Sequence, residues 1–307
     1  MWLLVLALAM PVRAETIRWV DFAVPYESLR YAMELDIATA EQEKHISWID
    51  VLAVAACRTG GKCGLGSVKQ AAEKLKGDKA PEEILGKLYQ YYPYYHASYS
   101  AVLGGLLGHY AIEVDGQWKP TYGLKAFSPV AAGYGYNHCS DFGNSRSFGF
   151  ARKHLGNDLM GTLGTPIVAV EGGVVEAMGW NRYGGWRIGI RSFDSKRYYY
   201  YAHLQKDRPF APGLALGDMV QAGQLIGFMG RTGYSDKENV NNIETVHLHF
   251  GMQLIFEESQ KECNSEIWID VYDIVRLLSE HRSSYRKTGD GWSRVYPFVD
   301  MDMNGLF

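Results

Sequence analysis

Short runs of β-prone residues separated by glycines make up most of the chain between residues 166 and 250. The runs 168–170, 174–180, 186–191 and 197–203 are rich in Val, Ile, Trp and Tyr, which favour strands. Tight turns between short strands require glycine, and glycine recurs between these runs. Since no helical pattern separates the runs, their arrangement predicts an antiparallel sheet or a small barrel.

Two histidines lie two residues apart at the end of this β-rich region, in the stretch Val246-His247-Leu248-His249-Phe250. Side chains alternate between the two faces of a strand, so both imidazoles point the same way, roughly 6.5–7 Å apart. This spacing suits one imidazole on a metal ion and the other beside the metal-bound water. Two half-exposed strand residues would give the same pattern, so the pair alone does not decide between these readings.

Further candidate ligands lie upstream of the pair. His154 and Asp158 are four residues apart across a Gly-Asn turn signal, and His203 follows a run of tyrosines. Catalytic zinc sites commonly use three His, Asp or Glu ligands plus a water molecule. His154, Asp158 and His249 supply such a set, which leaves His203 and His247 as imidazoles that are not ligands. Taken separately, the first two could be a surface pair on a helix, and His203 could be a core residue.

The stretch from residue 154 to residue 253 resembles the lysostaphin-type (LytM-like) zinc endopeptidases, which cut peptidoglycan peptides. The resemblance covers about one third of the chain. The matching motifs, in the family's order, are His154-x-x-x-Asp158, Gly164-Thr165-Pro166, Tyr183-Gly184-Gly185, Tyr201-Ala202-His203-Leu204, Gly223-Gln224-Leu225-Ile226-Gly227, Arg231-Thr232-Gly233-Tyr234-Ser235 and His247-Leu248-His249-Phe250. The chain departs from the family in a longer polar segment at 235–245 and in Val246, where the family has proline. We expect this insertion to alter the rim of the cleft and hence the choice of substrate.

The resemblance implies roles for five residues. His154, Asp158 and His249 would bind one zinc ion, with water at the fourth position. Zinc lowers the pKa of such a water molecule to about 7. His203 and His247 would orient the water, move its proton and stabilise the oxyanion, and the sequence leaves open which of the two is the base. No His-Glu-x-x-His sequence occurs, so the glutamate-base mechanism of that class does not apply.

The N-terminus predicts export. Residues 2–10 form an apolar run, and a small-residue cleavage site follows after Ala14, which is typical of a signal peptide over residues 1–14. The run is too short for a membrane span, which needs about 20 residues, although no Lys or Arg precedes it as signal peptides usually require. We therefore expect an exported protein, extracellular or associated with the cell wall. The net charge of −3 gives no indication of a nucleic acid or an anionic membrane as partner.

With 307 residues, the chain is long enough for two domains. Residues 15–126 are expected to form a helical domain, with amphipathic helices at 26–37, 46–56 and 67–76, another from Pro81 and one within 89–110. Its role stays open between a lysozyme-like domain, a wall-targeting module and an inhibitory pro-region. A glycosidase would need two carboxyl groups about 5–9.5 Å apart, for which Glu34, Glu41 and Glu43 are available.

Residues 127–256 are expected to form the peptidase domain and residues 257–307 a C-terminal helix, at 265–281, and a tail. The fold class is therefore α+β. The loop-like stretch 127–153 is expected to form one wall of the cleft, where Asn137 or His138 could cover the zinc ion. Further residues near the motifs are expected either to shape the groove, where basic groups would meet stem-peptide carboxylates, or to lie on a solvated surface. These residues are Arg152, Lys153, Tyr183, Arg187 and Tyr201.

Four cysteines allow three complete disulfide pairings, among which Cys57 and Cys63 could close a small loop; free thiols are the alternative. The oligomeric state is left open.

Two functions remain. The first is a secreted zinc metalloendopeptidase that hydrolyses peptide bonds in peptidoglycan stem peptides or cross-bridges. The second is a catalytically silent scaffold with the same fold that docks a partner in a cell-wall, division or sporulation complex. Silent members typically lack a metal ligand, and this chain retains all three, which favours the enzyme.

Overall fold

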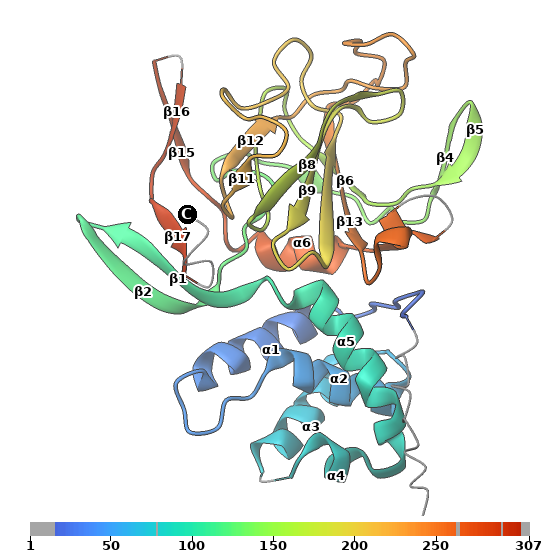
Figure 1. Cartoon of the computed structure of the whole chain (residues 1–307), viewed down its shortest axis with the longest axis vertical. Coiled ribbons are helices and arrows are strands. Elements are labelled where there is room, and N and C mark those ends of the chain that lie inside the picture. The colour runs from blue at the N-terminus through green and yellow to red at the C-terminus, as the bar shows by residue number, and fades with distance from the viewer. Residues whose placement is uncertain (1–15, 78, 262–264, 290, 302–307) are drawn as a thin grey trace, which may run out of the picture.

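The computed structural model describes residues 16–77, 79–261, 265–289 and 291–301. The expected signal peptide and Cys263 lie outside these residues. Helices form most of the N-terminal region, and an antiparallel sheet forms most of the remainder (Figure 1). The expected α+β fold, with a helical region ahead of the sheet, is confirmed.

The N-terminal helices form where the periodicity predicted them. They are α1 (Tyr26–Thr39), α2 (Trp48–Thr59), α3 (Leu65–Lys76), α4 (Pro81–Leu85), the 3-10 helix η1 (Gly86–Tyr91) and α5 (Tyr92–Leu103). The side chain of Ser47 accepts a hydrogen bond from the backbone N–H of Ile49 at the start of α2, and Gly60 ends that helix with a left-handed φ of 62°. None of the described helices combines the length and apolar composition that crossing a bilayer needs.

A hairpin follows the helices, where the sequence analysis expected the helical domain to continue to residue 126. Strands β1 (Leu107–Val114) and β2 (Gln117–Leu124) pair with each other, and β17 (Phe298–Asp300) extends this small sheet. Asp115 and Gly116 form the turn with φ values of 53° and 74°, as the two-residue hairpin turn requires. The helical prediction is therefore wrong for this segment, because an Asp-Gly turn joins two β-prone runs into a hairpin.

An eight-stranded antiparallel sheet forms the centre of the second half of the chain. Its strands are β3 (Asn137–His138), β6 (Asn157–Met160), β8 (Gly173–Asn181), β9 (Gly185–Ser192), β10 (Arg197–Ala202), β11 (Met219–Val220), β13 (His247–Leu254) and β14 (Ile267–Ile269). The order is β11-β8-β9-β10-β13-β6-β3, and β14 pairs with β13. Smaller pairs join β7 (Pro166–Val168) to β12 (Leu225–Phe228), β4 (Ser145–Phe148) to β5 (Phe150–Lys153), and β15 (Tyr285–Thr288) to β16 (Gly291–Arg294).

The C-terminal region differs from the helix expected over residues 265–281. The segment Ile267–Ile269 is strand β14, and the helix that follows, α6, is confined to Tyr272–Leu278. This segment is a strand because its backbone pairs with β13, where Ile269 lies opposite Met252 and Ile267 lies opposite Leu254. Both isoleucines are buried. Tertiary pairing has therefore overridden an apolar pattern that also suited a helix.

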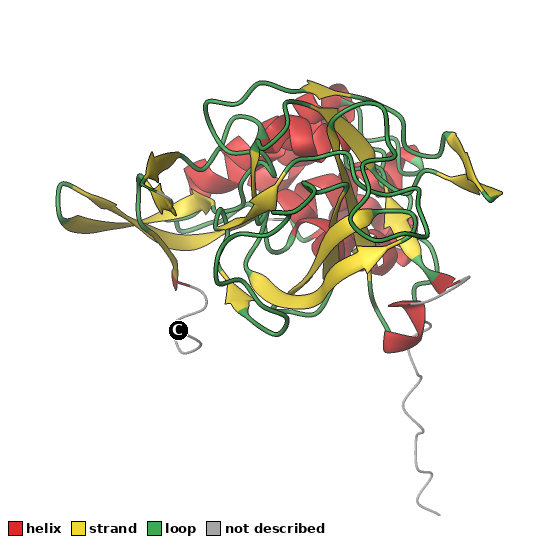
Figure 2. Ribbon diagram, turned by 90° about the horizontal axis from the view of Figure 1, so that it is seen from above, coloured by secondary structure: helices red, strands yellow, loops and turns green. Residues whose placement is uncertain are grey.

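The helical region packs against the sheet domain through one shared core. Figures 1 and 2 show the helices together on one side of the strands, with α1 and α5 beneath α6 and the sheet. Arg197 of β10 is fully buried at this contact, and its Nη1 donates a 2.7 Å hydrogen bond to the carbonyl of Ala101 in α5. Its guanidinium also contacts Glu171 (2.7 Å) and Asp194 (2.7 Å), and Tyr199 donates to Glu171 (2.6 Å). The charge of Arg197 is thus neutralised inside the protein.

Cys57 and Cys63 are both buried free thiols, which decides between the two alternatives of the sequence analysis. Burial raises the pKa of each to about 11. Both thiols are therefore protonated near neutral pH and unreactive, since the thiolate is the reactive form.

His138 occupies β3 and stacks on α6, with its ring centroid 4.4 Å from that of Tyr272. Its Nε2 is buried and has no hydrogen-bond partner among the residues that the structure describes. Burial, and then the charge of Arg276, lower the pKa of His138 from 6.5 to about 4. The residue is therefore neutral in the folded protein near neutral pH.

We predict that Arg197→Met lowers the free energy of unfolding by about 3–5 kcal/mol, because it leaves the Glu171 carboxylate buried without its cation. Denaturant unfolding of the full chain measures this. The double variant Glu171→Leu, Arg197→Met removes both charges and should recover most of the loss. Equal destabilisation by the single and the double variant would contradict the role of the pair.

We also predict a pH-dependent effect of His138→Phe. A histidine whose pKa is lower in the folded state stabilises the protein fully above its unfolded pKa, near 6.5, and this contribution is lost as the pH falls toward about 4. The variant should therefore gain roughly 1 kcal/mol relative to wild type for each pH unit below 6.5. Denaturant unfolding of the zinc-free proteins at pH 7.5, 6 and 5 tests this, and a constant difference would refute it.

Candidate metal centre and cleft

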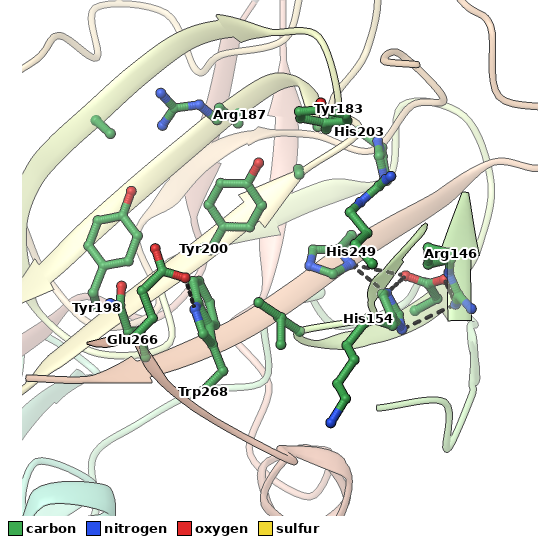
Figure 3. Close-up of a pocket in the computed structure, with 18 of the residues that line it drawn as sticks. Arg146, His154, Tyr183, Arg187, Tyr198, Tyr200, His203, His249, Glu266 and Trp268 are labelled. Atoms are coloured by element: carbon green, nitrogen blue, oxygen red, sulfur yellow. Dashed lines mark hydrogen bonds and ion pairs between the residues drawn. The ribbon is translucent and has the colours of Figure 1, made fainter. Parts of the chain in front are cut away.

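Three candidate ligand atoms converge where β6 and β13 pair. The register places His249 directly opposite Asp158, and His154 lies just ahead of β6. His154 Nε2 is 2.7 Å from His249 Nδ1 and 3.1 Å from Asp158 Oδ1, and the last two atoms are 3.3 Å apart. Figure 3 shows the two imidazoles turned toward each other at one end of the cleft.

These atoms fit a bound metal ion. Tetrahedral zinc with bonds of about 2.0–2.2 Å holds neighbouring ligand atoms roughly 3.3–3.6 Å apart. The two separations that involve Asp158 Oδ1, 3.1 and 3.3 Å, are close to this range, and the 2.7 Å between the two imidazole nitrogens is shorter. Asp158 Oδ1 is buried and accepts no hydrogen bond from the described residues, which is costly unless a cation completes the site. Although burial alone would raise the pKa of Asp158, the neighbouring imidazoles of His154 and His249, and then that of His247, lower it well below its ordinary value. The group could therefore hold a metal ion.

Two residues that the sequence analysis missed support the ligands from behind. The backbone carbonyl of Asp141 lies 3.1 Å from His154 Nδ1 and accepts a hydrogen bond from it, which leaves Nε2 without a proton and able to bind a metal ion. Arg146, on β4, donates to Asp158 Oδ2 (3.0 Å) and to Asp141 Oδ2 (2.5 Å). Only the fold brings these residues to the ligands, so no local motif marks them.

The structure brings His203 and His247 to the same place. Their ring centroids are 4.7 Å apart, and His247 Nε2 lies 3.7 Å from Asp158 Oδ1. The Nδ1 atoms of His203 and His247 lie 2.9 Å from the carbonyls of Thr232 and Thr245, respectively. Each Nδ1 therefore donates, and each Nε2 is free to act as a base. Burial, and then the charges of His247 and His249, lower the pKa of His203 well below its ordinary value.

Two backbone features hold the histidines in position. His203 follows directly after β10 and has a left-handed φ of 62°, which is uncommon for a residue other than glycine. Gly156 allows the loop before β6 to pass close to β13. A Cβ atom there would lie 2.5 Å from the Phe250 carbonyl and 2.8 Å from His249 Nε2, which would displace the ligand.

The three candidate ligands and the two further histidines, His203 and His247, lie at one end of a cleft of about 600 Å³. Arg152, Lys153, Tyr183 and Arg187 line it, as the groove interpretation expected. Tyr201 does not line it; it is fully buried, and its hydroxyl accepts a 2.9 Å hydrogen bond from the backbone of Val170. The correction follows from strand alternation, since Tyr198 and Tyr200 point into the cleft and Tyr201 points away from it.

No described residue before Arg146 lines the cleft, so neither the helices nor Asn137 or His138 cover the candidate ligands. The glutamates considered for a glycosidase are all solvent-exposed, and Glu34 forms an ion pair with Arg30 on the same helix. Nothing in the described helices therefore favours the glycosidase alternative.

Comparisons with known proteins agree with this geometry. Residues 152–262 match the model of peptidase family M23. An L-Ala–D-Glu endopeptidase of Bacillus subtilis is 42% identical over 124 residues, which are 40% of this chain and 36% of the relative. Lysostaphin of Staphylococcus simulans is 38% identical over 98 residues, which are 32% of this chain and 17% of the relative. The matched region thus spans well under half the length of either relative.

Among solved structures, one assigned to a glycyl-glycine endopeptidase lytM from Ruminococcus gnavus aligns with a TM-score of 0.54 and 21% identity. The alignment covers 85% of this chain and 89% of that chain, so the shared fold extends beyond residues 152–262. The segment 152–262 contains all four histidines and the aspartate that gather at the end of the cleft. The chain therefore carries a peptidase family M23 domain, homologous to those of lysostaphin and the L-Ala–D-Glu endopeptidase.

Proposed function

We propose that the protein is an exported, zinc-dependent endopeptidase that hydrolyses peptide bonds in peptidoglycan stem peptides or cross-bridges. The observation that carries the proposal is the convergence of His154, Asp158 and His249 on one point, with Asp158 Oδ1 buried and without a hydrogen-bond partner. Two imidazole nitrogens and one carboxylate oxygen at the end of an open cleft are the donors of a catalytic zinc site. The relatives' activities on peptidoglycan peptides support the choice of substrate.

In the proposed mechanism, bound zinc supplies Lewis-acid chemistry, lowering the pKa of a water molecule and polarising an amide carbonyl. The chain's own residues do the rest. His203 and His247 present Nε2 atoms that accept a proton, because their Nδ1 atoms are held by backbone carbonyls. The imidazolium that forms can then stabilise negative charge on the carbonyl oxygen or return the proton to the leaving amine. Tyr183, Tyr200 and Trp268 line the same cleft, where their rings would pack against the substrate.

The alternative of a catalytically silent scaffold has no comparable support. A scaffold would not need two non-ligand histidines with free Nε2 atoms beside the ligand set. The position of the helices, which leave the cleft open, favours a packing or targeting role for them over inhibition.

We predict that His249→Ala loses both zinc and the release of peptides from purified peptidoglycan, because only two ligands remain. Zinc content by atomic emission and released muropeptides by chromatography measure the two effects. His96→Ala, on the half-exposed surface of α5, is a matched control that should keep both. Equal release by wild type and His249→Ala, or wild type that binds no zinc, would refute the proposal.

We predict that His203→Asn keeps zinc but lowers kcat about 10²–10⁴-fold, the usual contribution of a general acid or base. Asparagine tolerates the left-handed backbone at this position better than alanine does. Zinc content and turnover of a fluorescent stem peptide distinguish the roles. Loss of zinc in this variant would make His203 a ligand instead.

A further inference from the structure

The cleft continues well beyond the candidate ligands, and half of the charged residues that line it are already paired. The charged residues that line it are Arg146, Arg152, Lys153, Asp158, Glu176, Arg187, Lys261 and Glu266. Arg146 is neutralised by Asp141 and Asp158, and Lys261 by Glu176. Arg152 forms no ion pair among the described residues, but its guanidinium stacks on the Tyr183 and Tyr234 rings, and Lys153 is exposed to solvent. The two charged lining residues that remain without an ion pair among the described residues are Arg187 and Glu266, in the part of the cleft away from the ligands.

Arg187 points into this part of the cleft from β9. Extending the pairing of β9 with β10 by one residue places it beside Ala202, which lies opposite His249 on β13. Two strand spacings amount to about 10 Å, so Arg187 and His249 belong to the same face of the sheet at that separation. In Figure 3 the Arg187 guanidinium lies beyond Tyr183 and Tyr200, away from the ligands.

The Nε of Arg187 is buried and has no hydrogen-bond partner among the described residues. A solvated surface arginine would leave this group in water. Arg182, five residues earlier, provides the contrast, because it is exposed and forms an ion pair with Asp236 at 3.2 Å. A buried guanidinium nitrogen without an acceptor is costly, and a ligand oxygen would remove the cost.

Tyr198 interacts with Arg187 but does not neutralise it. A Cβ atom at Gly189 would lie 1.8 Å from the Tyr198 hydroxyl, so the Tyr198 ring needs a glycine at this position of β9. Burial raises the pKa of Tyr198 to about 12, although Arg187 opposes the shift. Tyr198 is therefore a neutral hydroxyl, which can share a hydrogen bond with an anion but cannot replace it.

We propose that Arg187 is a specificity-determining residue that binds a free carboxylate of the peptide substrate, two to four residues from the bond that is cut. The guanidinium fork matches a carboxylate with two parallel hydrogen bonds and would discriminate against the corresponding amide. An extended peptide rises about 3.3 Å per residue, so a separation of about 10 Å sets this range. Glu266, held by Trp268 Nε1 at 2.8 Å, lies on the other side of Tyr198 and Tyr200 from Arg187 (Figure 3) and so does not occupy the subsite. The inference rests on the proposed function, since the ligand is a peptide in the same cleft.

The test compares three synthetic stem peptides: L-Ala–γ-D-Glu–L-Lys–D-Ala, the same peptide amidated at the glutamate α-carboxyl, and the same peptide amidated at its C-terminus. Calorimetric titration into the zinc-free full chain measures binding whether or not the chain cleaves these peptides. The acid peptide should bind about 10–100-fold more tightly than one of the two amides, as a charge-assisted hydrogen-bonded pair predicts. Arg187→Gln should abolish this preference, and Arg187→Lys should retain part of it, while Arg182→Gln, the matched control, should retain all of it.

Equal binding of all three peptides by wild type, including none, would overturn the subsite, as would full discrimination by Arg187→Gln. Thermal melting of each variant confirms that it is folded. Cleavage by the zinc-loaded chain is measured separately as kcat/KM. If the chain discriminates in binding but cleaves none of the peptides or purified peptidoglycan, the proposed function fails and the subsite stands. If it cleaves the acid and both amides with equal kcat/KM, the subsite fails and the proposed function stands.

Discussion

The register between β6, β13 and β10 is the constraint on which the rest of the site depends. It sets Asp158 opposite His249, and His249 opposite Ala202, one residue before His203. Because side chains alternate along a strand, slipping β13 by one residue would turn both of its histidines into the core and bring Leu248 and Phe250 into the cleft. The buried side chains on the far face oppose such a slip, since Leu159, Tyr201, Leu248 and Phe250 are all fully buried. The same alternation that builds the core therefore also fixes the ligands.

Charged groups on the two sides of this sheet are paired to different degrees. At the ligand end, Arg146 and Asp141 surround Asp158, while its Oδ1 is left without a hydrogen-bond donor. Behind the sheet, Arg197 is completely enclosed and satisfied by Glu171, Asp194 and Ala101. The Arg197 cluster and the candidate metal centre thus differ in one respect. The charged groups around Arg197 are paired with one another, whereas Asp158 Oδ1 at the candidate metal centre has no hydrogen-bond donor among the described residues.

The sequence predicted that His154, Asp158 and His249 belong to one site, because these residues lie within short motifs that can be recognised without knowledge of the fold. It also predicted the N-terminal helices, where the 3.6-residue periodicity is clear. It did not predict strand β14, since an Ile-Trp-Ile segment suits either structure until an edge of β13 becomes available. Arg146 was missed because it reaches Asp158 through the β4–β5 hairpin, for which no motif exists. The position of Tyr201 could have been read from strand alternation, which sets it on the opposite face from Tyr200.

The location of the helices has a consequence for how such a chain can be processed. They share one apolar core with the sheet domain, α1 contacts α6, and α5 supplies a carbonyl to Arg197. Proteolytic removal of residues 16–126 would not open the cleft, because none of these residues lines it. It would instead expose a broad apolar surface and Arg197 to solvent, so the shortened fragment would tend to aggregate. In this architecture the helical region is a structural part of the domain that carries the cleft.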